Sequence, residues 1–236
     1  RYHTLNYHLK HQFCGRVFKA VIDAGLHCPH AALGGCTYCI ENGSEFSHSS
    51  TLSITQQLQL EQTRICSKYG DTKLIAYFQA GTNTNADISF LKSLYEEALN
   101  FKNVVGLSIA TRPDCLAPEL FPFLEELSKR TYLTLELGLQ SAHNSTLERI
   151  NRGHTYECFC DTHRKLVNCG IRTCVHLING LPGESTDDMI ATARLLSKEN
   201  PNAVKLHLLH IMEGALIAEQ YRNNEFTALS QDEYVK

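Results

Sequence analysis

The segment Lys73-Leu-Ile-Ala-Tyr-Phe-Gln79 is a short, apolar, aromatic-rich run that ends at the turn residues Ala80-Gly81-Thr82-Asn83. This composition predicts a β-strand. Asp87 then provides an N-cap for a predicted helix whose apolar residues share one face: Ile88, Leu91, Leu94 and Ala98. This strand–helix unit decides the fold, because much of the remaining chain repeats it.

The same unit recurs on both sides of this segment. Apolar runs begin near residues 73, 104, 132, 171 and 204, at intervals of 28 to 39 residues, which is the length of a strand plus a crossover helix. Upstream, Val17–Ile22 is a predicted first strand, and Ser53-x-x-Gln56 is a capping box that begins a helix ending near Gly70. Later helices are predicted over 118–130, 143–150, 155–169 and 185–199. The pattern predicts a parallel sheet covered by helices, as a doubly wound sheet or a partial barrel.

The composition describes a globular protein without a strong charge. Of the residues, 43% are apolar and 20% charged, and 22 Lys and Arg stand against 25 Asp and Glu, so charge does not argue for nucleic-acid binding. No apolar run approaches the roughly 20 residues that a membrane span needs. Ten cysteines without a regular spacing or a signal-like start indicate a reducing cytoplasm rather than a secreted disulfide framework.

One cysteine-rich segment carries the candidate chemistry: Cys28-Pro-His-Ala-Ala-Leu-Gly-Gly-Cys36-Thr-Tyr-Cys39. Cys36 and Cys39 are separated by two residues and can wrap onto one ion or cluster, while the paired glycines let the backbone turn toward the third sulfur. Three thiolates leave one position open on an iron–sulfur cluster. A closed zinc site that borrows a neighbouring histidine is the alternative, and the triplet alone does not separate the two. The other seven cysteines are expected to be small core residues.

Polar or glycine-bearing segments follow the predicted strands. Because ligands of parallel α/β folds bind at the carboxyl ends of the strands, these exits are expected to form one site. They are the cysteine loop, Gln79–Asn83, Thr111–Asp114, Gln140–Ser141, Gly180–Glu184 and Lys205–His210. Glu136 faces either a barrel interior or the ligand, and Arg112 either fixes its turn or contacts the ligand.

Seven motifs occur in order between residue 28 and about residue 220. They are Gly35-Cys-Thr-Tyr-Cys39, Ala76-Tyr-Phe-Gln-Ala80 with Thr82, Thr111-Arg-Pro-Asp-Cys115, Glu136-Leu-Gly-Leu-Gln-Ser-Ala-His143, Arg149-Ile-Asn-Arg-Gly-His154, His176-Leu-Ile with Gly180-Leu-Pro-Gly-Glu184, and Lys205-Leu-His with Leu209-His-Ile211. In type and order they resemble the radical S-adenosylmethionine (SAM) enzymes. Within that superfamily they are most similar to the YhcC-like bacterial group, in the branch of the elongator subunit and coproporphyrinogen dehydrogenase.

The resemblance implies an α/β fold: a partial (β/α)6 TIM-like barrel with parallel strands inside and helices outside. It also implies a [4Fe–4S] cluster held by Cys28, Cys36 and Cys39, whose unique iron is chelated by the amino and carboxylate groups of SAM. The cysteine loop is shorter than is usual in that family, with seven residues between Cys28 and Cys36. The domains implied are an arm of residues 1–16, expected to be irregular, a core of 17–212, and the start of a truncated C-terminal extension over 213–236.

Roles in SAM binding follow from the matching motif positions. The segment Gln79, Ala80, Gly81 and Thr82 is similar to the one that receives the methionine amino group. Gln140 and Arg152 look like the polar pair near the methionine carboxylate and ribose. His176 and the turn at Gly180 look like the ribose and adenine side, and His207 would border the adenine.

The implied activity is reductive cleavage of SAM to methionine and a 5′-deoxyadenosyl radical that abstracts hydrogen from a substrate. The substrate class is open between a small molecule and RNA, and an electron donor such as flavodoxin or ferredoxin is expected. The alternative is a non-catalytic zinc- or nucleotide-binding module that retains the barrel. Metal analysis distinguishes these two functions.

Overall fold

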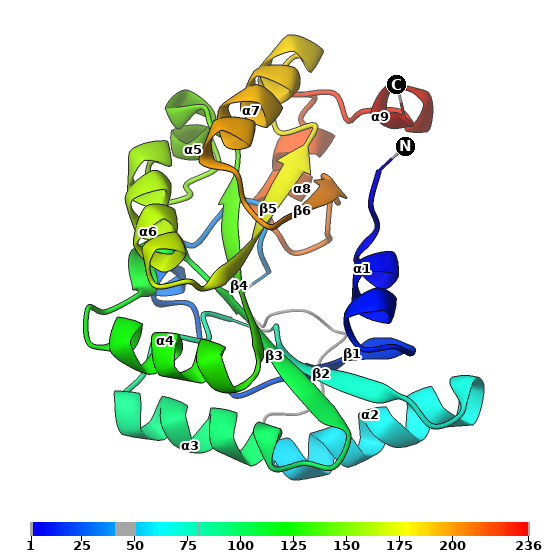
Figure 1. Cartoon of the computed structure of the whole chain (residues 1–236). Helices are drawn as coiled ribbons and strands as arrows, with labels where there is room; N and C mark the ends of the chain where they lie inside the picture. Colours follow the sequence, from blue (N-terminus) through cyan, green and yellow to red (C-terminus); the bar gives the residue numbers. More distant parts are fainter. Residues whose placement is uncertain (1, 41–50, 80, 236) are drawn as a thin grey trace.

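Six apolar segments of the chain form one parallel sheet in the computed structural model, which describes residues 2–40, 51–79 and 81–235 (Figure 1). The strands are β1 (Val17–Ile22), β2 (Lys73–Phe78), β3 (Val104–Thr111), β4 (Tyr132–Gln140), β5 (Arg172–Asn179) and β6 (Ala203–Leu208). Their order in the sheet is their order in the sequence, and each neighbouring pair is parallel. The order never reverses, as it does in a doubly wound sheet. The predicted partial barrel is therefore confirmed, with β1 and β6 as its two edges.

The predicted crossover helices are present on the outside of the curved sheet (Figure 1). They are α2 (Ile54–Tyr69), α3 (Ile88–Leu99), α4 (Leu120–Arg130), α5 (Asn144–Arg149), α6 (Tyr156–Asn168) and α7 (Thr186–Glu199). Ser53 and Gln56 form the predicted capping box, Asp87 caps α3, and Ser185 caps α7. Each cap satisfies an otherwise unpaired amide of the first helical turn, so the helices begin where the sequence indicates.

The two faces of the sheet differ in chemistry. On β4, Leu133, Leu135 and Leu137 belong to the main hydrophobic core between the sheet and the outer helices. Successive side chains of a strand point to opposite faces, so Glu136 points into the barrel interior. Only a few strand positions that face the interior carry polar groups, so the strand segments appear almost continuously apolar in the sequence.

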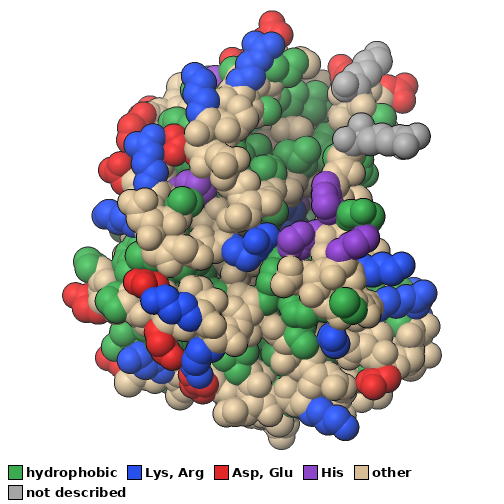
Figure 2. Space-filling view, in the orientation of Figure 1, with side chains coloured by type: hydrophobic (Ala, Val, Ile, Leu, Met, Phe, Trp, Pro, Cys, Tyr) green, Lys and Arg blue, Asp and Glu red, His purple; other side chains and the backbone are tan. Residues whose placement is uncertain are grey.

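Residues 5–12 form α1 (Leu5–Gln12), so the expectation that residues 1–16 are irregular is wrong for this part of the segment. Thr4 caps the helix, and Leu9 packs against Val17 and Ile75 on the interior face of the sheet. Figure 1 shows α1 beside β1, away from the outer helices. Histidines gather over this helix in Figure 2, where basic and acidic side chains are interspersed across the visible face.

The C-terminal residues are attached to the cysteine loop. They include α8 (Leu216–Arg222) and α9 (Gln231–Val235). The Ile217 side chain is fully buried with Ile150 and Leu209, and its amide donates a hydrogen bond to the Thr37 carbonyl oxygen at 2.8 Å. None of the helices in the described part of the chain has the length and apolar character required to cross a membrane.

Candidate functional site

The cysteine loop follows β1, as predicted, at the carboxyl end of the sheet. Cys28 precedes a short 3-10 helix, η1 (Pro29–Leu33), and two glycines with positive φ, +92° at Gly34 and +64° at Gly35, turn the chain back. Cys36 is buried, Cys28 is half-buried and Cys39 is exposed. The Cys39 amide donates to the Cys36 carbonyl oxygen at 3.0 Å, which forms a tight turn between these two residues.

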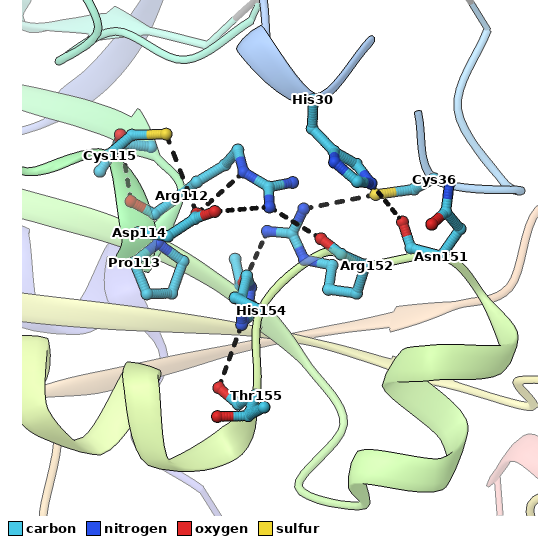
Figure 3. A network of polar contacts seen from close by, with 12 residues as sticks. His30, Cys36, Arg112, Pro113, Asp114, Cys115, Asn151, Arg152, His154 and Thr155 are labelled. Atoms are coloured by element: carbon cyan, nitrogen blue, oxygen red, sulfur yellow. Dashed lines mark hydrogen bonds and ion pairs between the residues drawn. The ribbon is translucent and has the colours of Figure 1, made fainter. Parts of the chain in front are cut away.

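The connection between α5 and α6 holds this loop in place (Figure 3). Asn151 Nδ2 donates to the Gly35 carbonyl oxygen at 2.7 Å, and the Thr37 amide donates to the Ile150 carbonyl oxygen at 3.0 Å. His30 Nε2 lies 2.6 Å from the Asn151 carbonyl oxygen. A Cβ atom on Gly153 would lie 2.5 Å from the His30 ring, so only glycine fits there. The motif Arg149–His154 therefore positions the cysteines, a role that the sequence did not reveal.

Arg152 is buried and touches the central cysteine (Figure 3). Its Nη1 donates to Cys36 Sγ at 3.4 Å and its Nη2 to the Gly138 carbonyl oxygen at 2.6 Å. The pKa of Cys36 is lowered to about 4, because the Cys39 thiol hydrogen-bonds its sulfur and Arg152 adds positive charge, against the opposing effect of burial. The Cys36 sulfur is thus prepared as a thiolate, the form that binds metals.

Arg112 fixes the turn after β3, in agreement with one of its two predicted roles. Arg112 is the N-cap residue of the 3-10 helix η2 (Pro113–Cys115), which contains Asp114. Its Nε and Nη2 each donate to one carboxylate oxygen of Asp114 at 2.9 Å. Nη2 also donates to the Arg152 carbonyl oxygen at 2.8 Å. The forked guanidinium thereby connects the β3 exit to the segment that carries the cysteine loop.

The β2 exit lies directly against the residues before Cys28. Gly81 has φ +72°, and a Cβ atom there would lie 1.6 Å from the Leu26 carbonyl oxygen. The Thr82 amide donates to that oxygen at 3.2 Å, and the Gln79 amide donates to the Ile22 carbonyl oxygen at 3.3 Å. Among the described residues, the buried Thr82 hydroxyl has no hydrogen-bond partner. The predicted residue Ala80 lies outside the described part of the chain.

Gln140 and Arg152 come together over Gly138, where a Cβ atom would lie 2.8 Å from Gln140 Nε2 and 2.7 Å from Arg152 Nη2. Gln140 has φ +78° at an irregularity in the β4–β5 register, a conformation that non-glycine residues rarely adopt. The rings of His176 and His207 lie 5.4 Å apart on β5 and β6. Gly180 instead faces the side chain of Leu229. The contacts of these residues with SAM stay predictions.

A second polar cluster occupies the barrel interior. The Glu136 carboxylate accepts short contacts from Lys19 and Ser108 and lies 2.8 Å from His176 Nε2. Burial opposes ionisation of Glu136, but the hydrogen bond from His176 and the charge of Lys19 outweigh burial and lower its pKa. Sequence reasoning missed Lys19. Its signal was a single cation within the apolar run Val17–Ile22, since a charge that folding removes from water requires a partner.

The remaining cysteines are only partly core residues. Cys160 and Cys174 are buried, and Cys66, Cys115, Cys158 and Cys169 are half-buried. Cys14 is exposed with φ +51°, so the expectation that it lies in the core is wrong.

Comparison with solved structures shows the same fold. The archaeal Methanocaldococcus infernus Elp3 with an N-terminal deletion aligns with 92% of this chain and 51% of its own, at 20% identity and a TM-score of 0.69. Coproporphyrinogen III oxidase (HemN) from Escherichia coli, described as a radical SAM enzyme, aligns with 93% of this chain and 50% of its own, at 16% identity and a TM-score of 0.59. The chain thus spans about half the length of these two structures.

Relatives found by sequence comparison share higher identity with this chain than these two structures do. The uncharacterized protein YtqA of Bacillus subtilis is 44% identical over all of this chain and 75% of its own length. MJ0486 of Methanocaldococcus jannaschii is 38% identical over 97% of this chain and 72% of its own, and YhcC of Escherichia coli is 34% identical over 96% and 74%. Residues 25–196 match the family model of the Radical SAM superfamily. The chain therefore belongs to the radical SAM superfamily, in the YhcC-like family that includes these relatives.

Proposed function

We propose that this chain is a radical SAM enzyme in which Cys28, Cys36 and Cys39 hold a [4Fe–4S] cluster and leave one iron for SAM. The observation that carries the proposal is the state of the cysteine loop. The loop presents three sulfurs, its central thiol has a lowered pKa, and Arg152 donates to that sulfur. This donor set fits a cluster bound by three thiolates, because hydrogen bonds to cluster sulfurs stabilise their negative charge. When bound, the cluster and SAM supply the reductive cleavage that yields the 5′-deoxyadenosyl radical.

The protein's own residues orient SAM and exclude water. The Thr82 hydroxyl, which has no partner among the residues that the structure describes, lies next to the chain that leads into Cys28 and suits a ligand amino or hydroxyl group. Gln140 supports the methionine end beside Arg152, while His176 and His207 line the nucleoside side. The Gly138 position is kept free of a side chain, so polar groups approach the backbone there.

The proposed enzyme also requires a substrate and an electron donor. A substrate in the barrel interior lies under the cysteine loop, at the carboxyl ends of the strands where ligands of such barrels bind. The substrate is a small molecule or an RNA group, and the electron comes from a flavodoxin or a ferredoxin.

The test is anaerobic reconstitution with iron and sulfide, followed by addition of SAM and dithionite. The wild-type chain is expected to show a brown, reducible absorption and to release 5′-deoxyadenosine. Cys36→Ala is expected to lose both properties. Cys158→Ala, which changes a half-buried cysteine on α6, is the matched control and should retain them.

Two results would overturn the proposal. One is a Cys36→Ala variant that retains the cluster and the release of 5′-deoxyadenosine. The other is one zinc ion and no sulfide in protein purified anaerobically, which would establish the zinc-binding module instead.

A further inference from the structure

The barrel interior contains more positive than negative charge. Lys19 on β1 pairs with Glu136 on β4. Lys205 on β6 also points inward, is half-buried, and forms no ion pair with any acidic residue in the described ranges. In the described ranges the Lys205 ammonium group therefore has no carboxylate at ion-pair distance, and chiefly the more distant charge of Glu136 offsets the burial that lowers its pKa. Such a group favours an anionic partner.

Lys205 reaches across the interior to the opposite side of the sheet. Its Nζ lies 3.5 Å from the hydroxyl of Tyr77 on β2 and 5.5 Å from the centre of that ring. Lys19 Nζ lies 4.2 Å from the centre of the same ring. A tyrosine ring attracts cations but does not neutralise them. Both ammonium groups thus lie against one buried tyrosine, and among the described residues a single carboxylate, Glu136, acts on both of them.

The other titratable groups of the interior add no negative charge. Burial, followed by the charge of Lys205, lowers the pKa of His207 to about 4, with His176 and His210 acting in the same direction. Burial also lowers the pKa of His176, although Glu136 opposes this effect. Burial raises the pKa of Cys174 to about 12. At neutral pH both histidines and this thiol are neutral and can offer uncharged hydrogen bonds to a ligand.

A metal ion is the competing occupant. The ligand atoms of Glu136, Cys174 and His176 lie within 4.8 Å of one another. However, Lys19 already occupies the carboxylate of Glu136, and Lys205 brings a second positive charge into the same interior. A divalent cation would have to approach against both charges. The charge distribution therefore favours an anion over a metal.

We propose that the interior binds its substrate through an oxyanion, a carboxylate or a phosphate, held by Lys205 and the Tyr77 hydroxyl with His207 beside it. This inference rests on the proposed function and names the substrate class. The geometry of the sheet supports access, because the two lysines come from β6 and β1, the edge strands that border the open side of the half-barrel. An anion that enters from that side meets both ammonium groups.

The test is equilibrium dialysis of the reconstituted protein with radiolabelled acetate and, separately, radiolabelled inorganic phosphate, in chloride-free buffer of low ionic strength. Saturable binding of one ion is expected, and the ion that binds more tightly identifies the group. Lys205→Met should weaken that binding about ten-fold or more, since a hydrogen bond to a charged group is lost. Lys205→Arg, which keeps the charge, should retain most of it. Lys198→Met, at an exposed lysine on α7, should match the wild type.

The test distinguishes failure of the anion-binding inference from failure of the proposed function. Absence of saturable binding of either ion, or equal binding by Lys205→Met and wild type, would overturn the inference. Displacement of the bound ion by excess SAM would also overturn it, because the site would then belong to the SAM carboxylate. Release of 5′-deoxyadenosine by the wild type, measured in parallel without substrate, reports on the proposed function independently. A protein that releases it but binds neither ion refutes only the present inference.

Discussion

Two buried polar networks occupy neighbouring levels of the barrel, and they differ in how completely their charges are paired. Under the cysteine loop, Arg112 is paired with Asp114, and Arg152 with Cys36 and a backbone oxygen (Figure 3). In the interior, Glu136 is shared by Lys19 and His176, whereas the polar contact of Lys205 among the described residues is the Tyr77 hydroxyl. The first network fixes backbone segments to one another. The second leaves a positive charge available.

The difference separates a scaffold from a binding site. Arg112 binds a carbonyl oxygen of the α5–α6 connection and Arg152 binds one of β4, so their contacts determine where the cysteines lie. The interior side chains stand on rigid strands and bind mostly other side chains, so they connect no backbone segments and hold a fixed geometry for a ligand. Four substitutions, ordered by the size of the expected effect, test this comparison.

Gly81→Ala is expected to have the largest effect, because it acts on the backbone of the scaffold. The new Cβ atom would overlap the Leu26 carbonyl oxygen at a residue with positive φ, and we expect a loss of about 4 kcal/mol in the free energy of unfolding together with poor cluster incorporation. Urea denaturation and iron content measure both. Gly170→Ala is the matched control, since Gly170 also has a positive φ of +70° but no described atom within 4 Å of the added Cβ, and only about 1 kcal/mol should be lost. Equal losses would show that the close approach at Leu26 does not matter.

Glu136→Gln tests the interior network. It leaves the Lys19 ammonium without its carboxylate, and we expect the free energy of unfolding at pH 7 to fall by about 3 kcal/mol. Glu125→Gln removes an exposed pair with Lys129 and should cost about 0.5 kcal/mol or less.

The Glu136→Gln difference should also depend on pH. The folded-state pKa of Glu136 is below its ordinary value of 4.5, so its contribution is present above pH 4.5 and is lost as the pH falls toward the folded-state pKa. The gap between wild type and variant should therefore narrow under acid conditions in urea titrations. A gap that is constant from pH 7 to acid would contradict the ion pair.

Arg152→Met removes the donor to Cys36 Sγ and to the Gly138 carbonyl oxygen. We expect a loss of about 2 kcal/mol in the free energy of unfolding. Under the proposed function, the reconstituted variant should also have a more negative reduction potential, since a hydrogen bond to a cluster sulfur favours the reduced state. Arg222→Met, at an exposed pair with Glu213, should change neither quantity appreciably. An unchanged potential in Arg152→Met would place this arginine outside the cluster environment.

Asn151→Gly is expected to have the smallest effect. Glycine keeps the positive φ of +49° but loses the hydrogen bond to the Gly35 carbonyl oxygen, which should cost about 1 kcal/mol. Amide hydrogen exchange at Thr37, which is bonded to the neighbouring Ile150, should accelerate. Asn103→Gly, at a half-buried asparagine with φ +72°, should leave that amide unchanged. Unchanged exchange in both variants would show that Asn151 does not hold the loop.

Local signals predicted most of the fold. Strand positions follow from apolar runs, and helix starts follow from Ser53, Asp87 and Ser185, because a cap and its amide lie within one turn. The prediction failed at α1, where a polar segment with a single buried leucine gives no clear periodicity. The motif order indicated the strand ends that carry the candidate site. It did not indicate that Asn151 and His30 hold the cysteine loop in place, because this depends on contacts between distant loops.

The sequence by itself determined the repeating strand–helix unit, the family and the cysteine triplet, since each can be recognised from short runs of consecutive residues. Only the tertiary structure decided which charges are paired. Lys19 meets Glu136 across 117 positions and Cys36 meets Arg152 across 116. Such pairing depends on the register of strands and on distances of a few ångströms, which local propensity does not encode. Only the parallel sheet, which brings β6, β2 and β4 around one interior, shows that Lys205 forms no ion pair with the described acidic residues.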